Sequence, residues 1–108
     1  MSKPPLYKIH VANQYGFGDK VAGAAVVGCL VRNGINAVFD TPKVHDLVDC
    51  PKIENIKNPE DYEILSHTLN RPYRKNPDYH FYSDLIKNFT NWTKKNTTHP
   101  IEQELHID

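Results

Sequence analysis

The residues between Asn13 and Lys20 combine side chains and backbone freedom suited to holding a small ligand. Gly16 and Gly18 allow unusual backbone angles and let a ligand approach the main chain closely. Lys20 offers a positive charge, while Asn13 and Gln14 can hydrogen-bond polar substituents of a ligand. This pattern predicts a loop that holds a small phosphorylated or nucleotide-like molecule. The loop residues expected to bind it are Asn13, Gln14, Gly16, Phe17, Gly18, Asp19 and Lys20.

Neither of the two standard phosphate-binding fingerprints fits this loop. The dinucleotide fingerprint requires a third glycine three residues after the second, where this chain has Val21, and the next glycine is Gly23. The Walker fingerprint requires a Gly-Lys-Ser/Thr sequence, which does not follow. Asp19 would also repel a bare phosphate at a helix start, so we expect a sugar hydroxyl or a bound cation at that point.

Two further groups of residues could complete such a site. Asp40 follows Gly18 at roughly the 20-residue separation at which an acidic residue receives ribose hydroxyls in dinucleotide-binding units. The same aspartate, followed by Thr-Pro, also suits an ordinary strand-ending turn. Arg71 and Arg74 belong to a local basic patch that would supply positive charge if it folds over the glycine loop. A solvated connection explains that patch without a ligand.

The elements that must position these residues follow from apolar runs and helix signals. We expect a first strand over residues 6–12, a helix over 21–33 and a second strand over 35–40. Asp19 would cap the helix and Asn33-Gly34 would stop it. A strand, loop, helix and strand in this order place the loop at the carboxyl end of a strand, where α/β proteins hold phosphates and nucleotides. Because the helix is almost entirely small or apolar, we expect it to be buried on most sides.

The opening third of the chain resembles a known family. The run Gly18-Asp19-Lys20-Val21, followed by a small-residue helix, Leu30, Gly34 and a second strand, resembles the start of the N-terminal half of GT-B glycosyltransferases, particularly the ADP-heptose transferases. In that family a Gly-Asp pair begins the first helix and its aspartate is proposed to act as base on the acceptor hydroxyl. The resemblance implies Asp19 as the matching base, with the second lobe supplied by another chain.

The second half of the chain predicts two amphipathic helices. Asn58-Pro59 and Asn76-Pro77 each provide an asparagine cap, a proline at the first helical position and acid in the first turn. The helix from Pro59 would present Tyr62, Leu65 and Leu69 on one face. The helix from Pro77 would carry a broad apolar stripe made of Phe81, Tyr82, Leu85, Ile86, Phe89 and Trp92.

Shorter elements complete the expected architecture. Residues 53–56 predict a short third strand and residues 44–48 one helical turn. Residues 100–108 alternate between apolar and polar side chains. This pattern fits either an edge strand of the same sheet or an exchangeable arm that adds to the sheet of a neighbouring chain. The wide aromatic stripe and this tail leave open a second alternative to ligand binding, a protein–protein interaction module.

Composition limits the function classes. At 108 residues the chain is one α/β domain, and equal numbers of acidic and basic residues leave no net charge to steer it toward nucleic acid or an anionic membrane. Its longest apolar run is well short of the ~20 residues that cross a bilayer. Two cysteines and the lack of a secretion signal favour the cytoplasm. A chain rich in Asn, Lys, Ile and Tyr is typical of an AT-rich genome, such as that of a virus or a low-GC bacterium.

The other candidate chemistry is weak. The histidines form no helical i, i+4 pair, and the densest group, His45-Asp46 with Asp49-Cys50, fits a solvated loop, so we expect no metal and no cofactor. No acid, base, nucleophile and orienting partner occur together. The sequence therefore predicts a single small Rossmann-like α/β domain with a short, mainly parallel sheet, a buried glycine- and alanine-rich helix and two amphipathic helices. It is expected to bind a ligand without catalysis, and it leaves a homo-oligomer open.

Overall fold

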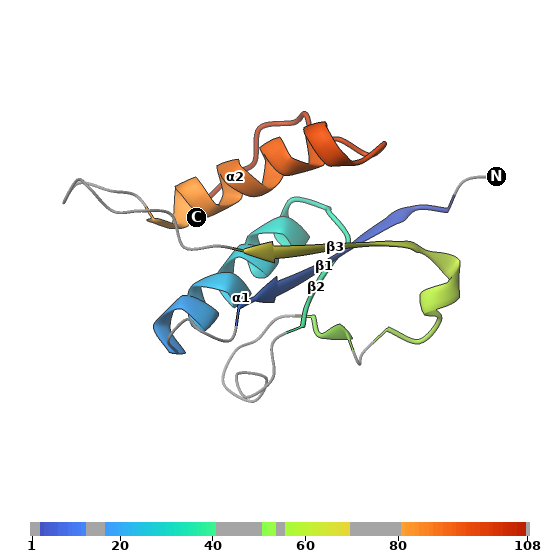
Figure 1. Cartoon of the computed structure of the whole chain (residues 1–108), viewed down its shortest axis with the longest axis horizontal. Helices are drawn as coiled ribbons and strands as arrows, with labels where there is room; N and C mark the ends of the chain where they lie inside the picture. Colours follow the sequence, from blue (N-terminus) through green and yellow to red (C-terminus); the bar gives the residue numbers. More distant parts are fainter. Residues whose placement is uncertain (1–2, 13–16, 41–50, 54–55, 70–80, 108) are drawn as a thin grey trace.

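The computed structural model of the protein describes residues 3–12, 17–40, 51–53, 56–69 and 81–107. Within these ranges three strands form one parallel sheet in the order β2-β1-β3, accompanied by two α-helices (Figure 1). The elements are β1 (Pro5–Val11), α1 (Phe17–Arg32), β2 (Ala37–Phe39), a 3-10 turn (Pro59–Asp61), β3 (Glu63–Leu69) and α2 (Phe81–Asn96). This is an α/β arrangement consistent with a small Rossmann-like domain, which confirms the predicted fold class.

The central strand β1 defines two faces of the sheet. It pairs with β2 from Tyr7↔Ala37 to Ile9↔Phe39, and with β3 over the full length of both strands. Because strand residues alternate between faces, paired positions lie on the same side of the sheet. One face, which we call the helix face, carries Tyr7, Ile9, Val11, Ala37, Phe39, Leu65, His67 and Leu69. The opposite face, which we call the crossover face, carries Leu6, Lys8, His10, Val38, Ile64, Ser66 and Thr68.

Both α1 and α2 pack on the helix face, where the main core lies. Ile9 and Phe39 of the sheet, Val26 of α1 and Phe89 of α2 are completely buried in one cluster. The Tyr7 ring meets the Phe89 ring edge-on, with centroids 5.3 Å apart. Burying aromatic and branched side chains in this way supplies most of the favourable free energy of folding.

Gly23 brings α1 unusually close to the sheet. A Cβ atom at this position would lie 2.5 Å from Cγ2 of Val11, 3.3 Å from Cε1 of Phe39 and 3.6 Å from Cδ1 of Leu69. These three residues belong to β1, β2 and β3, so one glycine sets the approach of α1 to every strand. Close helix–strand packing is the role of the third glycine in the dinucleotide fingerprint. Here that role falls two residues later than the fingerprint requires.

The end of α1 confirms the predicted Asn33-Gly34 stop. Gly34 has φ +80°, its N–H donates to the Val31 carbonyl at 3.0 Å, and the Ile35 N–H donates to the Leu30 carbonyl at 3.0 Å. This is a Schellman motif, which favours glycine at the residue with positive φ. The predicted start is wrong, because α1 begins at Phe17 and Asp19 lies in its first turn instead of capping it. An acidic side chain in a first turn still suits the helix dipole.

The helix predicted from Pro59 is also wrong. Asn58 and Pro59 start only the 3-10 turn, and the backbone is extended from Tyr62 onward, with φ −121° and ψ 151°. The spacing of Leu65 and Leu69 fits both a helical period and the two-residue period of a strand, so local sequence does not decide between them. Pairing with β1 does decide, and it makes residues 63–69 the third strand. The short strand expected over 53–56 is therefore not the third strand, and residues 44–48 lie outside the described ranges.

Described residues of the β2–β3 connection lie beside the crossover face, opposite to the face on which α1 and α2 pack. Leu6 and Val38, on the crossover face, are 2% and 1% exposed, and they line one cavity together with Pro51, Ile56 and Tyr62. These three residues therefore help to shield Leu6 and Val38 from solvent. Lys52 forms a single parallel bridge with Phe39.

The helix predicted over the aromatic stripe is confirmed as α2, with Leu85, Ile86 and Phe89 buried. Residues 101–107 form no strand, so the expected edge strand is wrong. They run back beside α2, and Ile107 lines the same groove as Ser83 near the start of that helix (Figure 1). Two of their apolar side chains pack against the core: Ile101 is 7% exposed and Leu105 is partly buried, whereas Ile107 is 42% exposed. The alternating pattern therefore places apolar side chains on the core without forming a strand.

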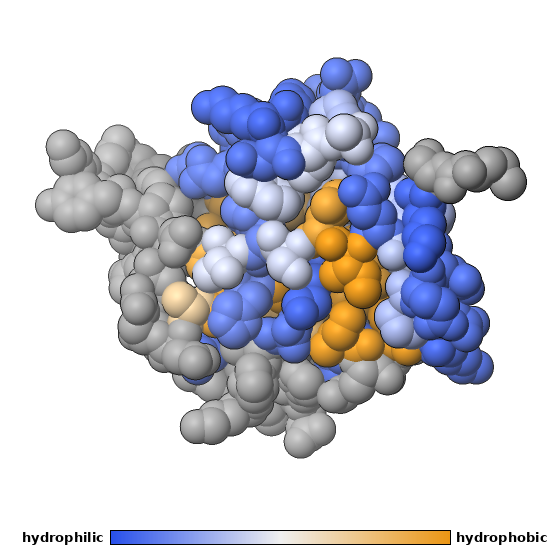
Figure 2. Space-filling view, turned by 45° about the vertical axis from the view of Figure 1, so that its right-hand side comes forward, coloured by the Kyte–Doolittle hydropathy of each residue, from blue (hydrophilic) through white to orange (hydrophobic). Residues whose placement is uncertain are grey.

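No helix in the described part of the chain is long and apolar enough to cross a membrane. The coloured residues on the face shown in Figure 2 are mainly hydrophilic, with an apolar area, in orange, near the centre. Among the described large apolar side chains, the most exposed are Val31, Ile64 and Ile107, at 39%, 40% and 42%.

Candidate ligand-binding site

The carboxyl edge of the sheet brings the start of α1 close to the ends of β1 and β2. The chain passes from β1 to α1 on the helix face, whereas three described residues between β2 and β3, Pro51, Ile56 and Tyr62, lie beside Leu6 and Val38 of the crossover face. Open α/β sheets bind ligands in the crevice where connections divide in this way. The first-turn N–H groups of α1, from Phe17 to Lys20, have no acceptor within the helix, and the helix begins at this edge.

The sequence-predicted residues are only partly covered by the described ranges. Asp19 and Lys20 lie in the first turn of α1, and only the backbone of Phe17 and Gly18 is described there. Asp40 directly follows β2 at the same edge. The remaining predicted residues, Asn13, Gln14, Gly16, Arg71 and Arg74, lie outside the described residues, as does the group around His45 and Cys50.

Asp40 is held beside β1 by main-chain and side-chain contacts. Its N–H donates to the Ile9 carbonyl at 2.8 Å, which extends the β1–β2 ladder by one residue. Its Oδ2 lies 3.5 Å from Nζ of Lys8, and both side chains are 34% exposed. A half-exposed pair at this distance contributes little stability, so a ligand could exchange with either partner at small cost.

His10 is oriented by the same residue. Nδ1 of His10 lies 2.7 Å from the main-chain oxygen of Asp40. Because a carbonyl oxygen only accepts, Nδ1 carries the hydrogen of this contact, and in the neutral form of the ring Nε2 keeps its lone pair. The ring therefore offers a fixed acceptor at the carboxyl edge.

A row of polar side chains continues from β1 onto β3. Lys8 pairs in register with Ser66, and His10 with Thr68, and both hydroxyl side chains belong to exposed residues. Central strands of parallel sheets are normally apolar on both faces. The crossover face departs from this rule only in its carboxyl-terminal half. We call Lys8, His10, Asp40, Ser66 and Thr68 the polar strip.

Sequence reasoning found only Asp40 among these five residues. A signal was present in β1, where Lys8 and His10 interrupt the apolar run at alternate positions. It indicates a strand with one polar face, although it does not identify what lies opposite. Ser66 and Thr68 had no such signal, because they join the strip only through the β1–β3 register.

The strip offers groups for binding. An ammonium group can offset the charge of a phosphate, a carboxylate can accept hydrogen bonds from sugar hydroxyls, and an imidazole nitrogen can accept another. Within the described ranges no hydroxyl group is hydrogen-bonded to a histidine ring, so the nucleophile–base pair of a hydrolase is not assembled there. The residues that the structure describes also contain no group of three His, Cys, Asp or Glu side chains that could hold a metal ion.

Comparisons with models of known protein families, with characterised proteins and with solved structures gave no match to this chain.

Proposed function

We propose that this protein binds a small phosphorylated or nucleotide-like ligand at the carboxyl edge of its sheet, without catalysing a reaction. One observation carries the proposal: Asp40 ends β2 within 3.5 Å of Lys8 and beside His10, at the edge where α1 begins. A cation, a carboxylate and a ring-nitrogen acceptor thus lie together at the edge where α1 begins, the edge at which open α/β sheets hold ligands. Such a protein would sense or sequester a nucleotide metabolite.

Each group has a distinct role in this proposal. The Asp40 carboxylate accepts hydrogen bonds from the sugar hydroxyls, and the Lys8 ammonium offsets the negative charge of the ligand. Nε2 of His10 accepts a further hydroxyl hydrogen. Asp19, in the first turn of α1, favours an uncharged, hydroxyl-bearing part of the ligand at the helix start over a bare phosphate.

Thermal unfolding against a panel of nucleotides, nucleotide sugars and sugar phosphates tests the proposal. A ligand at 100 times its dissociation constant stabilises the fold by about 2.7 kcal/mol, and about 1 kcal/mol moves the Tm of a small domain by roughly 4–8 °C. We expect at least one compound to raise the Tm. No response to any member of the panel would refute the proposal.

A matched pair of variants locates the binding. Asp40→Asn removes the carboxylate at the carboxyl edge and should abolish most of the ligand-induced rise in Tm. Asp61→Asn removes an exposed carboxylate from the 3-10 turn at the amino-terminal side of β3 and should leave that rise unchanged. Equal losses in both variants would show that the ligand responds to overall charge and not to this site.

The same panel separates binding from the glycosyltransferase-like alternative. We expect nucleotide sugars to remain unchanged on prolonged incubation with the protein. Turnover that disappears in Asp19→Asn would instead favour an enzyme that uses Asp19 as base.

A further inference from the structure

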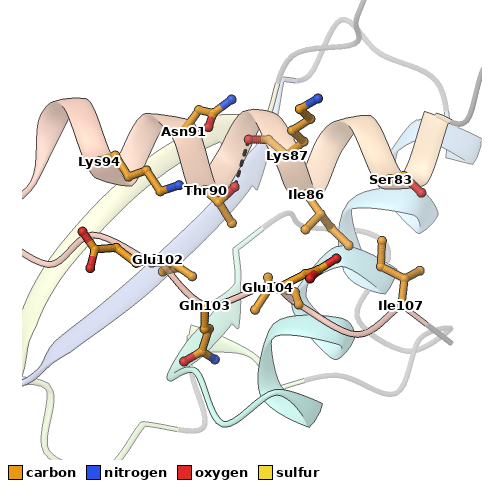
Figure 3. Close-up of a pocket in the computed structure, with 12 residues that line it drawn as sticks. Ser83, Ile86, Lys87, Thr90, Asn91, Lys94, Glu102, Gln103, Glu104 and Ile107 are labelled. Carbon is orange, nitrogen blue, oxygen red and sulfur yellow. Dashed lines mark hydrogen bonds between the residues drawn. The ribbon is translucent and has the colours of Figure 1, made fainter.

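A groove lies between α2 and the tail formed by residues 101–107, on the opposite side of the sheet from the polar strip. It has a volume of about 420 Å³, and Figure 3 shows α2 along one side and the tail along the other. Apolar side chains of both elements, including Ile86 and Ile107, line it together with charged and amide groups. The groove is therefore suited to an extended segment with both apolar and charged residues.

The tail that forms one wall is fixed near both ends. The Ile101 N–H donates to Oγ1 of the buried Thr93 at 3.0 Å. At the other end the Asn33 side chain accepts from the His106 N–H at 2.9 Å and donates to the His106 carbonyl at 3.1 Å. The side-chain amide of Gln103 also donates to the Asn33 carbonyl at 3.2 Å. The wall is thus held in place before any partner binds.

Between these anchors the tail backbone has unused hydrogen-bonding capacity. The N–H and C=O groups of residues 102–105 make no hydrogen bond to any other described residue. Backbone groups left unpaired beside a groove are what an added extended segment uses for pairing. The tail therefore presents a short edge to a second segment.

The two walls carry opposite charges. Lys87 and Lys94 line the groove from α2, seven residues apart and hence on one flank of the helix. Glu102 and Glu104 line it from the tail, and all four residues are exposed. No ion pair between these residues occurs in the described structure. A segment that brings carboxylates to α2 would find two lysines without partners.

The tail itself has the composition that such a segment needs. Its acidic residues Glu102 and Glu104 alternate with Gln103 and Leu105, and it is part of no helix or strand of its own. We propose that the tail of a second copy of this chain binds in the groove, antiparallel to the resident tail and related to it by a two-fold axis. Each copy then directs Glu102 and Glu104 toward Lys87 and Lys94 of the other, so that one self-complementary contact is made twice. This interface keeps α2 and the tail of the interaction hypothesis but uses the polar flank of α2, not its buried aromatic stripe.

Charge reversal tests this interface by its oligomeric state. Light scattering and sedimentation equilibrium of the full chain should show a dimer whose population rises with concentration. Lys87→Glu with Lys94→Glu, and separately Glu102→Lys with Glu104→Lys, should each raise the dimer Kd by about tenfold or more, because like charges then meet across the groove. An equimolar mixture of the two variants should form a heterodimer, since both contacts become complementary again.

Controls make the outcome decisive. Lys95→Glu alters the exposed neighbour of Lys94 that does not line the groove, and Lys57→Glu alters an exposed lysine far along the chain. This control pair should leave the dimer Kd unchanged.

A wild-type chain that stays monomeric at millimolar concentration would overturn the proposal, as would a dimer that survives both reversals. Binding of an acidic peptide by a strictly monomeric chain would show that the groove takes a different partner. Circular dichroism and Tm confirm folding, and single Lys94→Glu and Glu104→Lys variants replace any double variant that fails to fold.

Discussion

The two faces of the sheet differ sharply in what they contribute. The helix face is closed by α1 and α2 over residues such as Ile9, Phe39 and Phe89, all of them fully buried. The crossover face is apolar at Leu6 and Val38, which are buried, and at Ile64, which is 40% exposed, and it is polar where the strands end. Stability is therefore concentrated on one face, and the other carries the polar groups of the proposed site. Substitutions that change stability on one face and not on the other test this division.

The largest effect is expected at Phe89, whose ring is buried against Tyr7 and His67. Phe89→Ala should lower the free energy of unfolding by about 3–5 kcal/mol, because it removes a large buried side chain and leaves a cavity. Urea unfolding monitored by circular dichroism measures the loss. A change smaller than that of Ser66→Ala on the crossover face would contradict the assignment of the core to the helix face.

Gly23→Ala should come next, with a loss of about 1–3 kcal/mol. The added methyl group would lie 2.5 Å from Val11, so α1 must move away from the sheet. Gly28→Ala is the matched control, since the new Cβ would meet only Nη1 of Arg32 at 3.3 Å, the far end of a flexible side chain. Alanine at that helical position should be neutral or stabilising by up to about 1 kcal/mol. Equal responses of the two variants would show that Gly23 does not set the packing distance.

A smaller, pH-dependent effect is expected from His67 on the helix face. Its ring packs against both Phe89 and Trp92, with centroids 5.4 and 4.5 Å away, and burial lowers the pKa of His67 below its ordinary value of 6.5. The unfolded chain then binds the proton more readily than the folded one. The contribution to stability is complete above pH 6.5 and is lost as the pH falls through the lowered pKa. Tm measured from pH 8 to pH 5, a range of about three units around the ordinary histidine pKa, should fall more steeply for the wild type than for His67→Gln.

The smallest effect is expected on the crossover face. Lys8→Met breaks the ion pair with Asp40, whose partners are each 34% exposed. The change in unfolding free energy should stay within about 1 kcal/mol, while the ligand-induced rise in Tm should be reduced. A large loss of stability would mean that the polar strip serves the fold and is not available for binding.

Local sequence was sufficient for elements whose signals are local. The β1–α1–β2 unit and α2 follow from apolar periodicity, the Asn33-Gly34 stop and helical spacing. The prediction from local sequence was wrong at residues 63–69, because the spacing of Leu65 and Leu69 fits both a strand and a helix. Only the pairing with β1 distinguishes the two structures. The tail failed for a related reason, since alternation does not reveal whether the apolar side faces a strand or two helices.

The candidate site shows the same limit. Asp40 could be predicted because its separation from Gly18 along the chain is itself the signal. Lys8, His10, Ser66 and Thr68 become one group only when β1 and β3 pair in register, and these strands are far apart in sequence. Gly23 was noted as a failure of the fingerprint, and its packing role appears only with the three strands beneath it.

The central position of β1 has a consequence for the order in which the protein folds. Its pairing with β2 closes a short loop around α1, whereas its pairing with β3 joins Val11 to Leu69 across more than half of the chain. Contacts between distant residues cost more loop-closure entropy and form more slowly. We expect β1, α1 and β2 to associate first and β3 to dock last, so that amide protons of β2 gain protection from exchange before those of β3 during refolding. The chain would thus complete the Ser66 and Thr68 side of its polar strip only in the final step of folding.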